Sequence, residues 1–360
     1  MAVNVPTLEF LLPGDPQTLT GGYEYDRRIG DGLRSLGWKV GVHSLDQRFP
    51  FPTAESLADA DRQLAALPDR SLVLIDGLAL GAMPGVAHAH AERLKLVGLM
   101  HHPLAAETGL PQDMALQLFE SERRALKAMR MVIVTSHTTR RSLAAYGVSA
   151  DRIGVVEPGI DQPAVADAVA AARNTEEPLQ MLCVATITPR KGHDVLVDAL
   201  ADLRNHAWVL NCVGDTERSP ETTAALRSRI AAAGLADRIR LLGALDAQSL
   251  ARQFQDSDLF VLATHFEGYG MAVAQALAYG LPVISTRTGA IDELVPEHAG
   301  LLVQPNDVSA LRDALASVFS HPFLRRSLAQ GAGDVGRKLP SWRDASERFA
   351  AVLLDASARL

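Results

Sequence analysis

Short apolar runs alternate with helix-like segments along the whole chain. Runs such as SLVLID at 71–76 and DLFVLA at 258–263 are apolar at nearly every position, which is typical of parallel strands that helices cover on both faces. This alternation predicts an α/β protein with parallel sheets. The expected strands are 7–12, 39–45, 72–76, 95–100, 131–135, 153–156, 181–186, 208–213, 239–242, 259–263, 282–286 and 300–303. The expected helices are 23–36, 54–66, 112–128, 138–146, 192–203, 220–233, 247–255, 271–279, 308–319 and 342–360.

A polar, alanine-rich segment at 161–180, DQPAVADAVAAARNTEEPLQ, separates two complete strand–helix series. A chain of 360 residues is also too long for one ordinary core. We therefore expect two doubly wound domains, 1–170 and 176–340, followed by an amphipathic helix at 342–360. Ligands of such sheets bind beyond the carboxyl ends of the strands, so a cleft between the halves is the natural place for a site.

Composition excludes several classes of protein. The net charge of −7 argues against a nucleic-acid partner. No positive segment precedes the first apolar run, and no run approaches the ~20 residues that a membrane span needs. Cys183 and Cys212 both lie in apolar runs and lack zinc-ligand spacing, which favours buried free thiols and a reducing, cytoplasmic setting.

Two segments of the first half carry candidate chemistry. In DPQTLTGGYEYDRRIGDGL, Gly21 and Gly22 precede a helix, where a backbone without side chains can approach a phosphate or sugar. In LMHHPLAAETG, His101 and His102 follow a strand end. Side chains alternate along a strand, so we expect only one of the two to face a ligand. A plain turn and a structural histidine remain alternatives for these segments.

The second half offers a matched pair of loops. In VATITPRKGHDVLVDAL, Arg190 and Lys191 end a strand and would suit a diphosphate. In THFEGYGMAVAQALAYG, Glu267 precedes a glycine turn that opens a helix. The helix end favours an anion, whereas the carboxylate favours hydroxyls, and a nucleotide-sugar has both. A solvated basic turn and a surface glutamate are the alternatives.

Together these segments resemble the retaining glycosyltransferases of the GT-B fold, specifically family 4 (glycosyl transferases group 1). The resemblance rests on the Gly-Gly loop, the strand-end histidine, VIVTSHTTRRSLAAYGVSADRIGVVEPGID, TPRKG, VGD, ADRIRLLG and EGYGMAVAQALAYGLPVISTRTGAIDEL, in that order over nearly the whole chain. It implies two Rossmann-like domains facing across a cleft. The acceptor would bind mainly to the first domain and the activated sugar to the second. The last helix would return to the first domain.

The resemblance also implies roles by position. His102 resembles the histidine that contacts the donor sugar, because its context HPLA fits slightly better than that of His101. Lys191 matches the pyrophosphate lysine, and Glu267 matches the first acid of the E-x7-E element, which should hold sugar hydroxyls. The remaining donor-binding positions are Gly21 and Gly22 (a loop over the donor phosphate), Leu245 (nucleobase), and Gly268, Tyr269, Gly270, Met271 and Ala272 (diphosphate and sugar).

Two positions depart from the family pattern. The second acid, which binds the ribose, is Gln275 here; an amide can still donate and accept hydrogen bonds with a diol. The usual Gly-Arg before the lysine is Ala185-Thr186, so we expect Arg190 to replace the missing pyrophosphate arginine.

The implied enzyme is a hexosyltransferase of the EC 2.4 class. It would move a sugar from a UDP- or GDP-sugar to an acceptor hydroxyl with retention, by a front-face mechanism. Neither a cofactor nor a metal is expected. The acceptor would be a glycan, a glycolipid or a small molecule. A catalytically silent nucleotide-sugar-binding protein and another GT-B enzyme, such as a nucleotide-sugar epimerase, are the alternatives.

Basic residues near the end of the first half could form a face that contacts a lipid membrane. Glu120 and Glu122 interrupt this set, which favours a solvated face. Peripheral membrane contact and a homodimer both stay open. The basic residues are Arg123, Arg124, Lys127, Arg130, Arg140 and Arg141.

Overall fold

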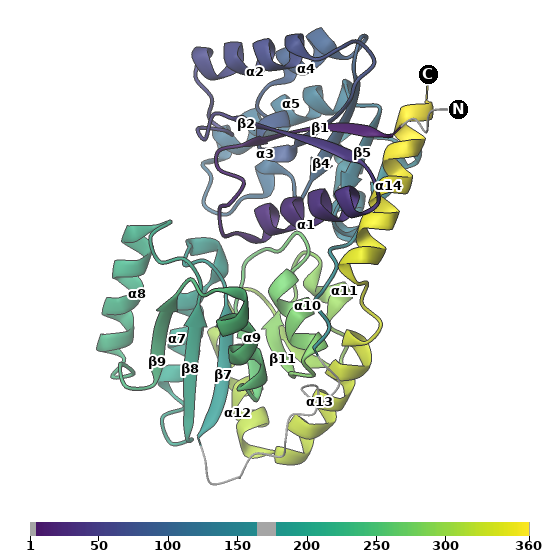
Figure 1. The fold of residues 1–360 in the computed structure, drawn as a ribbon. Coiled ribbons are helices and arrows are strands. Elements are labelled where there is room, and N and C mark those ends of the chain that lie inside the picture. The colour runs from purple at the N-terminus through teal and green to yellow at the C-terminus, as the bar shows by residue number, and fades with distance from the viewer. Residues whose placement is uncertain (1–4, 164–177, 360) are drawn as a thin grey trace. The chain divides into compact units, whose positions relative to one another are not determined.

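The protein divides into two compact units. A computed structural model describes residues 5–163 and 178–359. Unit 1 consists of residues 1–159 with 340–360, and unit 2 consists of residues 160–339 (Figure 1). The boundary that we expected between residues 170 and 176 lies outside the described residues.

Unit 1 is a six-stranded parallel sheet with helices on both faces. Its strand order is β2-β1-β3-β4-β5-β6, which extends the flavodoxin-like order and reverses between β1 and β3. The strands are β1 (Thr7–Pro13), β2 (Lys39–Leu45), β3 (Leu72–Asp76), β4 (Lys95–Met100), β5 (Met131–Val134) and β6 (Ile153–Val155). The helices are α1 (Gly21–Ser35), α2 (Ala54–Ala66), α3 (Gly77–Leu80), α4 (Pro84–His90), α5 (Gln112–Lys127), α6 (His137–Ser142) and α14 (Trp342–Ala358).

Unit 2 repeats this plan with the Rossmann strand order. The sheet order β12-β11-β10-β7-β8-β9 reverses between β7 and β10. The strands are β7 (Leu179–Val184), β8 (Trp208–Val213), β9 (Ile239–Gly243), β10 (Leu259–Leu262), β11 (Val283–Thr286) and β12 (Gly300–Val303). The helices are α7 (His193–Ala201), α8 (Pro220–Ala232), α9 (Ala247–Gln255), α10 (Met271–Ala278), α11 (Ile291–Leu294), α12 (Val308–Ser320) and α13 (Pro322–Gly336). The predicted fold class, two α/β domains with parallel sheets, is confirmed.

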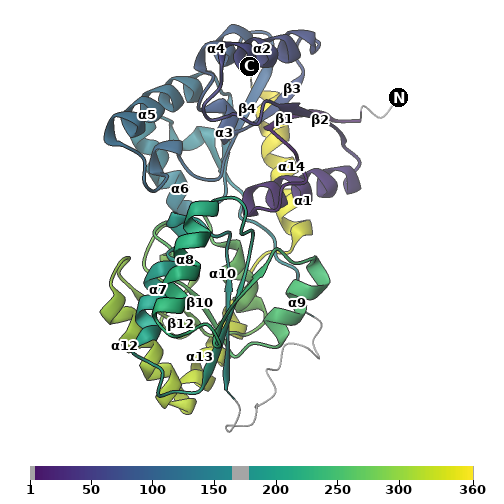
Figure 2. The same cartoon turned by 90° about the vertical axis from the view of Figure 1, so that its left-hand side faces the viewer.

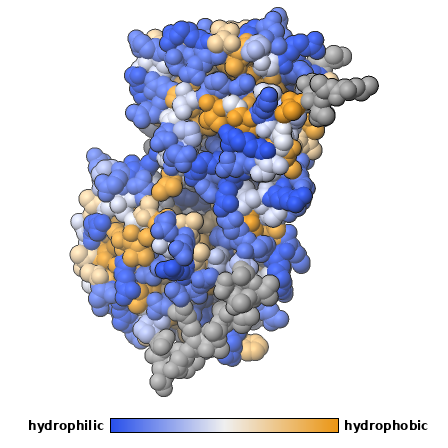
Figure 3. Space-filling view, in the orientation of Figure 1, coloured by the Kyte–Doolittle hydropathy of each residue, from blue (hydrophilic) through white to orange (hydrophobic). Residues whose placement is uncertain are grey.

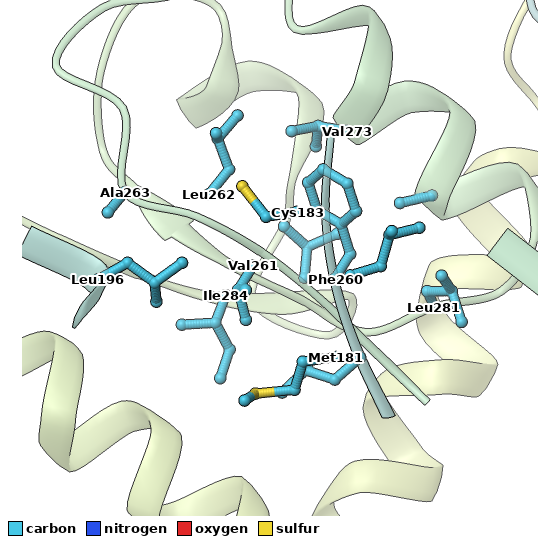
Figure 4. Packing of buried hydrophobic residues seen from close by; sticks show 14 of the residues in the cluster. Met181, Cys183, Leu196, Phe260, Val261, Leu262, Ala263, Val273, Leu281 and Ile284 are labelled. Atoms are coloured by element: carbon cyan, nitrogen blue, oxygen red, sulfur yellow. The ribbon is translucent and has the colours of Figure 1, made fainter. Parts of the chain in front are cut away.

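The core of unit 2 shows why the central strand β10 is apolar at every position. Phe260 and Val261 of β10 point to opposite faces of the sheet, and both are fully buried. Figure 4 shows β10 side chains packed among Met181 and Cys183 of β7 and Val273 of α10. Because both faces of β10 are covered, this strand carries apolar side chains on both of them.

The chain end belongs to unit 1, where α14 packs along α1 (Figure 2). The rings of Trp342 and Phe349 contact Tyr25 of α1, with centroids 6.2 and 6.4 Å away. Ser346 lies so close to Gly32 that a Cβ at Gly32 would be 1.9 Å from its Oγ. The amphipathic stripe of α14 is therefore buried against α1.

One face of the molecule is mainly polar (Figure 3). On the face that Figure 3 shows, hydrophilic side chains cover most of each unit and apolar ones form small groups. None of the helices within the described residues is both long and apolar enough to cross a bilayer.

Candidate functional site

The loops that follow β7 and β10 bring three predicted residues together at the switch point of unit 2. Lys191 Nζ lies 2.5 Å from Glu267 Oε1, and Arg190 Nη1 lies 3.5 Å from the same oxygen. Arg190 also donates to the carbonyl oxygen of Phe266, 2.7 Å away. Thr264 donates its hydroxyl to Glu267 at 3.0 Å. We call Arg190, Lys191 and Glu267 the switch-point cluster. Parallel sheets bind their ligands at this position.

The cluster keeps Glu267 ionised despite its burial. The residue is only 7% exposed. Burial alone would raise its pKa, but the charges of Lys191 and Arg190 outweigh burial, and the net effect is a lowered pKa. Both cations are therefore held at one spot by a single carboxylate. A diphosphate carries the same sign of charge and can compete for them.

Helix α10 starts beside this cluster. Gly270 is its N-cap with φ of 96°, a left-handed conformation that glycine adopts without strain. The first N–H groups of a helix have no intrahelical acceptor, and together with the helix dipole they favour an anion. Tyr269 is buried, while Met271 and Ala272 are half-buried. Residues 268–272 therefore lie where free backbone N–H groups could bind a phosphate.

Gln275 has a different neighbour from the ribose that the resemblance implies. Its Nε2 donates to the carbonyl oxygen of Asp161 at 2.7 Å, and its Oε1 accepts from the N–H of Asp161 at 3.3 Å. Both polar ends of the amide are therefore used by one peptide position at the start of unit 2.

Thr186 and Leu245, the other two positions that the resemblance places at the donor, lie after β7 and β9, the strands on either side of β8. Thr186 is half-buried in the loop after β7. Leu245 follows β9 and is half-buried, and Leu242 before it is 37% exposed. Thr186 and Leu245 both lie beyond the carboxyl ends of these strands, and their roles toward a donor stay predictions.

In unit 1 the structure places His101, and not His102, in a buried group of charges. His101 Nε2 lies 3.2 Å from Asp26 Oδ1 and 3.6 Å from Asp76 Oδ2. His102 instead approaches Glu107, at 3.4 Å. Asp26 comes from α1, Asp76 ends β3 and His101 follows β4, so the three residues form what we call the Asp–His cluster.

The Gly-Gly segment adjoins the same cluster. Gly21 and Gly22 form the first turn of α1 rather than a loop before it. A Cβ at Gly22 would lie 3.4 Å from His101 Cδ2, so the first turn of α1 lies within van der Waals distance of the imidazole. Sequence reasoning missed Asp26 and Asp76. The available signal was the acid that ends the apolar run SLVLID, but pairing it with His101 requires knowing that β3 and β4 are neighbours.

Glu122 does not interrupt the basic residues on a solvated face, contrary to our expectation, because its side chain is buried. It is fully buried on α5, and both of its carboxylate oxygens accept from the N–H of Leu104, at 3.1 and 3.2 Å. Burial raises the pKa of Glu122 to about 7. Glu120 is exposed and pairs with Arg123 at 2.7 Å. Glu122 thus holds the loop that follows the two histidines.

Two groups within the described residues could ligate a metal ion. One is the Asp–His cluster, and the other is Cys183, His193 and Cys212 in the core of unit 2. Cys183 and Cys212 face each other on β7 and β8 as buried free thiols. Cys183 Sγ lies 3.8 Å from His193 Nε2. The sequence spacing of these residues gave no sign of this arrangement.

The chain matches known protein families over both of its sheets. Residues 25–162 match the family described as Glycosyltransferase Family 4, and residues 178–321 match the family described as Glycosyl transferases group 1. The chain belongs to glycosyltransferase family 4. The first match runs from α1 past β6, and the second from β7 into the end of α12, so both the Asp–His cluster and the switch-point cluster lie inside matched segments.

Individual family members show how far the similarity extends. A D-inositol 3-phosphate glycosyltransferase from Saccharomonospora viridis is 27% identical over 71% of this chain, and the match spans 62% of that protein's own length. Sucrose-phosphate synthase from Thermosynechococcus elongatus has a TM-score of 0.81 at 21% identity, covering 97% of this chain and 98% of that one. HepE from Anabaena, solved in complex with UDP-glucose, has a TM-score of 0.76 at 18% identity, covering 97% and 99%. These structural neighbours establish the GT-B fold.

Proposed function

We propose that this glycosyltransferase family 4 protein transfers a sugar from a nucleotide-diphosphate sugar to an acceptor hydroxyl, with the anomeric configuration kept. The observation that carries the proposal is the switch-point cluster: two cations and one buried carboxylate meet beside the N-terminus of α10. The cations suit the diphosphate, and the carboxylate suits the sugar hydroxyls.

The donor is a UDP- or GDP-sugar in this proposal. The complex of HepE with UDP-glucose supports a uridine nucleotide. A donor diphosphate would displace Glu267 from Lys191 and Arg190, and Glu267 would then accept hydrogen bonds from the sugar. Arg190 takes the place of the arginine that the family usually carries at the position of Thr186.

The reaction follows from where the charge develops. The bond between the anomeric carbon and the leaving phosphate oxygen breaks, and a bond to the acceptor oxygen forms on the same face. The departing phosphate oxygen takes the acceptor proton. Lys191, Arg190 and the N–H groups that open α10 stabilise the negative charge of the diphosphate, which is the largest charge to develop. Because these groups supply the positive charge, the transfer proceeds without a divalent metal.

Nucleotide binding gives the first test. We expect one of UDP, GDP, ADP and dTDP to raise the melting temperature in the presence of a chelator. A ligand at a hundred times its dissociation constant adds about 2.7 kcal/mol of stability. Failure of all four would overturn the proposed donor site. Binding with neither transfer nor donor hydrolysis would instead support a silent nucleotide-sugar-binding protein.

Variants then test the assigned roles. Lys191→Ala and Arg190→Ala should each weaken donor binding by about tenfold or more, since each removes a charge-assisted hydrogen bond. Arg229→Ala is the matched control, because Arg229 forms an exposed ion pair with Asp198 on the outer side of unit 2 and should leave donor binding unchanged. An unaltered donor KM in Arg190→Ala would remove Arg190 from the site. NMR of the product distinguishes retention from inversion, and recovery of an isomerised donor without transfer would indicate an epimerase.

A further inference from the structure

The Asp–His cluster places two buried carboxylates against one imidazole. The side chains of Asp26 and Asp76 are each 4% exposed, and that of His101 is 21% exposed. Asp76 also accepts the N–H of Leu78 at 2.9 Å as the N-cap of α3. Two adjacent buried carboxylates are costly unless a cation or a shared proton neutralises them. Within the described part of unit 1, the imidazole of His101 is the cation-forming group that both of them reach.

The other neighbours of His101 are committed elsewhere. Tyr25 packs edge-on against the ring, with centroids 5.4 Å apart, but its hydroxyl donates to the carbonyl oxygen of Val156 at 2.9 Å. The hydroxyls of Thr135 and Thr139 donate to the backbone carbonyl oxygen of His101, not to its ring. Asp26 and Asp76 are therefore the titratable groups that face the imidazole from α1 and β3.

The two ring nitrogens consequently have different roles. Nε2 faces the carboxylates, while Nδ1 has no hydrogen-bond partner among the described residues and belongs to a side chain that solvent reaches. A carboxylate bonded to one nitrogen of a histidine fixes which nitrogen serves the ligand.

We infer that Asp26 and Asp76 are positioning residues: they hold His101 as an imidazolium whose Nε2–H is committed to Asp26 and whose Nδ1–H is offered to the ligand. Asp26 orients the ring, and Asp76 adds the second negative charge that keeps the proton in place. The use of this proton donor in turnover rests on the proposed function, whereas the charge state of His101 does not.

The electrostatics of the cluster agree with this geometry. Burial by itself would lower the pKa of His101, but the charge of Asp26, its hydrogen bond and the charge of Asp76 outweigh burial and raise the pKa. Burial and the neighbouring charge of Asp26 raise the pKa of Asp76 to about 7. Both pKa values are therefore shifted in the direction that favours a proton within the cluster.

NMR titration of the imidazole tests the inference without any substrate. The full chain is labelled with ¹³C,¹⁵N-histidine and chelated, because the same three groups lie within reach of one metal ion. His101→Gln assigns the resonance. We expect His101 in the unsubstituted chain to titrate above the ordinary value of about 6.5. Asp76→Asn should lower this pKa, and Asp26→Asn should lower it further and release the Nε2–H tautomer that the ¹⁵N shifts report.

A second histidine–carboxylate pair in unit 1 provides the control. His90 Nε2 lies 2.9 Å from Asp61 Oδ1, so Asp61→Asn should perturb His90 and leave His101 unchanged. Titration of His101 at or below about 6.5, or a pKa that Asp76→Asn does not change, would overturn the inference. If Asp26→Asn does not fold, the result for Asp76→Asn decides.

Activity adds a readout that a purely structural role would not affect. In Asp76→Asn the alkaline limb of the kcat/KM profile should move to lower pH, with near-normal activity retained on the acid side. Asp26→Asn should lower kcat by about a hundredfold, the usual contribution of a positioned proton donor. A shifted titration in a chain that transfers no sugar would leave the Asp–His cluster intact and refute the proposed function. A shifted titration with an unshifted pH profile would refute the role in turnover.

Discussion

At the scale of single residues, Gln275 shows how a substitution can redirect a side chain. The family pattern places an acid here, and a carboxylate has only acceptors. The amide donates to and accepts from the same peptide position, Asp161, and a glutamate could not make both bonds. The residue therefore fastens α10 to the first residues of unit 2.

Gln275→Glu should destabilise unit 2. It removes the hydrogen bond donated to the Asp161 carbonyl oxygen and sets a negative charge against that oxygen, at a cost of about 0.5–1.5 kcal/mol because the contact is exposed. The melting temperature should fall by several degrees, measured by circular dichroism at pH 7. Gln248→Glu, at an exposed position of α9, should leave it nearly unchanged. Equal stability of the two variants would show that the contacts with Asp161 contribute nothing.

Single residues also mark the limit of sequence reasoning about the site. The types and order of Arg190, Lys191 and Glu267 were sufficient to predict that these three side chains come together. The choice between the two histidines was not accessible in this way. The chain bends directly after β4, so strand alternation cannot be extended to His101 and His102. His101 meets Asp26 and Asp76, whereas His102 meets Glu107. The role of His102 toward a donor sugar stays a prediction.

At the scale of elements, the turn between β7 and α7 depends on Gly192. The residue has φ of 62°, and a Cβ there would lie 2.0 Å from the carbonyl oxygen of Ala263 in the loop after β10. Gly192→Ala should therefore force the two loops of the switch-point cluster apart. We expect nucleotide affinity to fall at least tenfold and unfolding to become easier by about 1–3 kcal/mol.

A matched glycine separates these effects. Gly234 ends α8 with φ of 65° and has nothing within 4 Å of its Cβ position. Gly234→Ala should cost stability through its backbone conformation alone and leave nucleotide affinity intact. Isothermal titration with the nucleotide that binds best provides the comparison. Normal affinity in Gly192→Ala would mean that the loops tolerate the extra atom.

The pattern of apolar runs predicted the twelve strands of the described residues, because parallel strands buried on both faces leave an unbroken signal. Four helices escaped prediction: α3, α4, α11 and α13. The first three are one or two turns long, too short to show a 3.6-residue period. The segment QGAGDVG of α13 has three glycines, which are poor helix formers and weaken the helical pattern. They serve close packing instead, since a Cβ at Gly331 would lie 1.8 Å from the carbonyl oxygen of His298.

At the scale of the whole molecule, buried acids make the stability of the folded state depend on pH. Glu122 has a pKa of about 7 in the folded chain and an ordinary value of 4.5. Between these values the folded state binds more protons than the unfolded state, so stability falls as pH rises. The contribution of Glu122 is fully present below pH 4.5 and is lost as pH passes 7. Asp76, with a pKa also about 7, acts in the same direction.

Glu122→Gln should remove part of this pH dependence. A glutamine can still accept from the N–H of Leu104 but cannot ionise, so the variant gains stability relative to the unsubstituted chain as pH rises from 5 to 8. The shift in pKa sets an upper bound of about 3 kcal/mol. Urea unfolding followed by circular dichroism at pH 5, 6, 7 and 8 gives the difference. Glu120 lies two positions away in an exposed ion pair with Arg123. The stability of Glu120→Gln should change with pH as that of the unsubstituted chain does, because exposed pairs contribute little. If the stability of Glu122→Gln showed the same pH dependence as that of the unsubstituted chain, Glu122 would ionise in the folded chain near its ordinary pKa. The loop after the two histidines would then be held by a charged carboxylate.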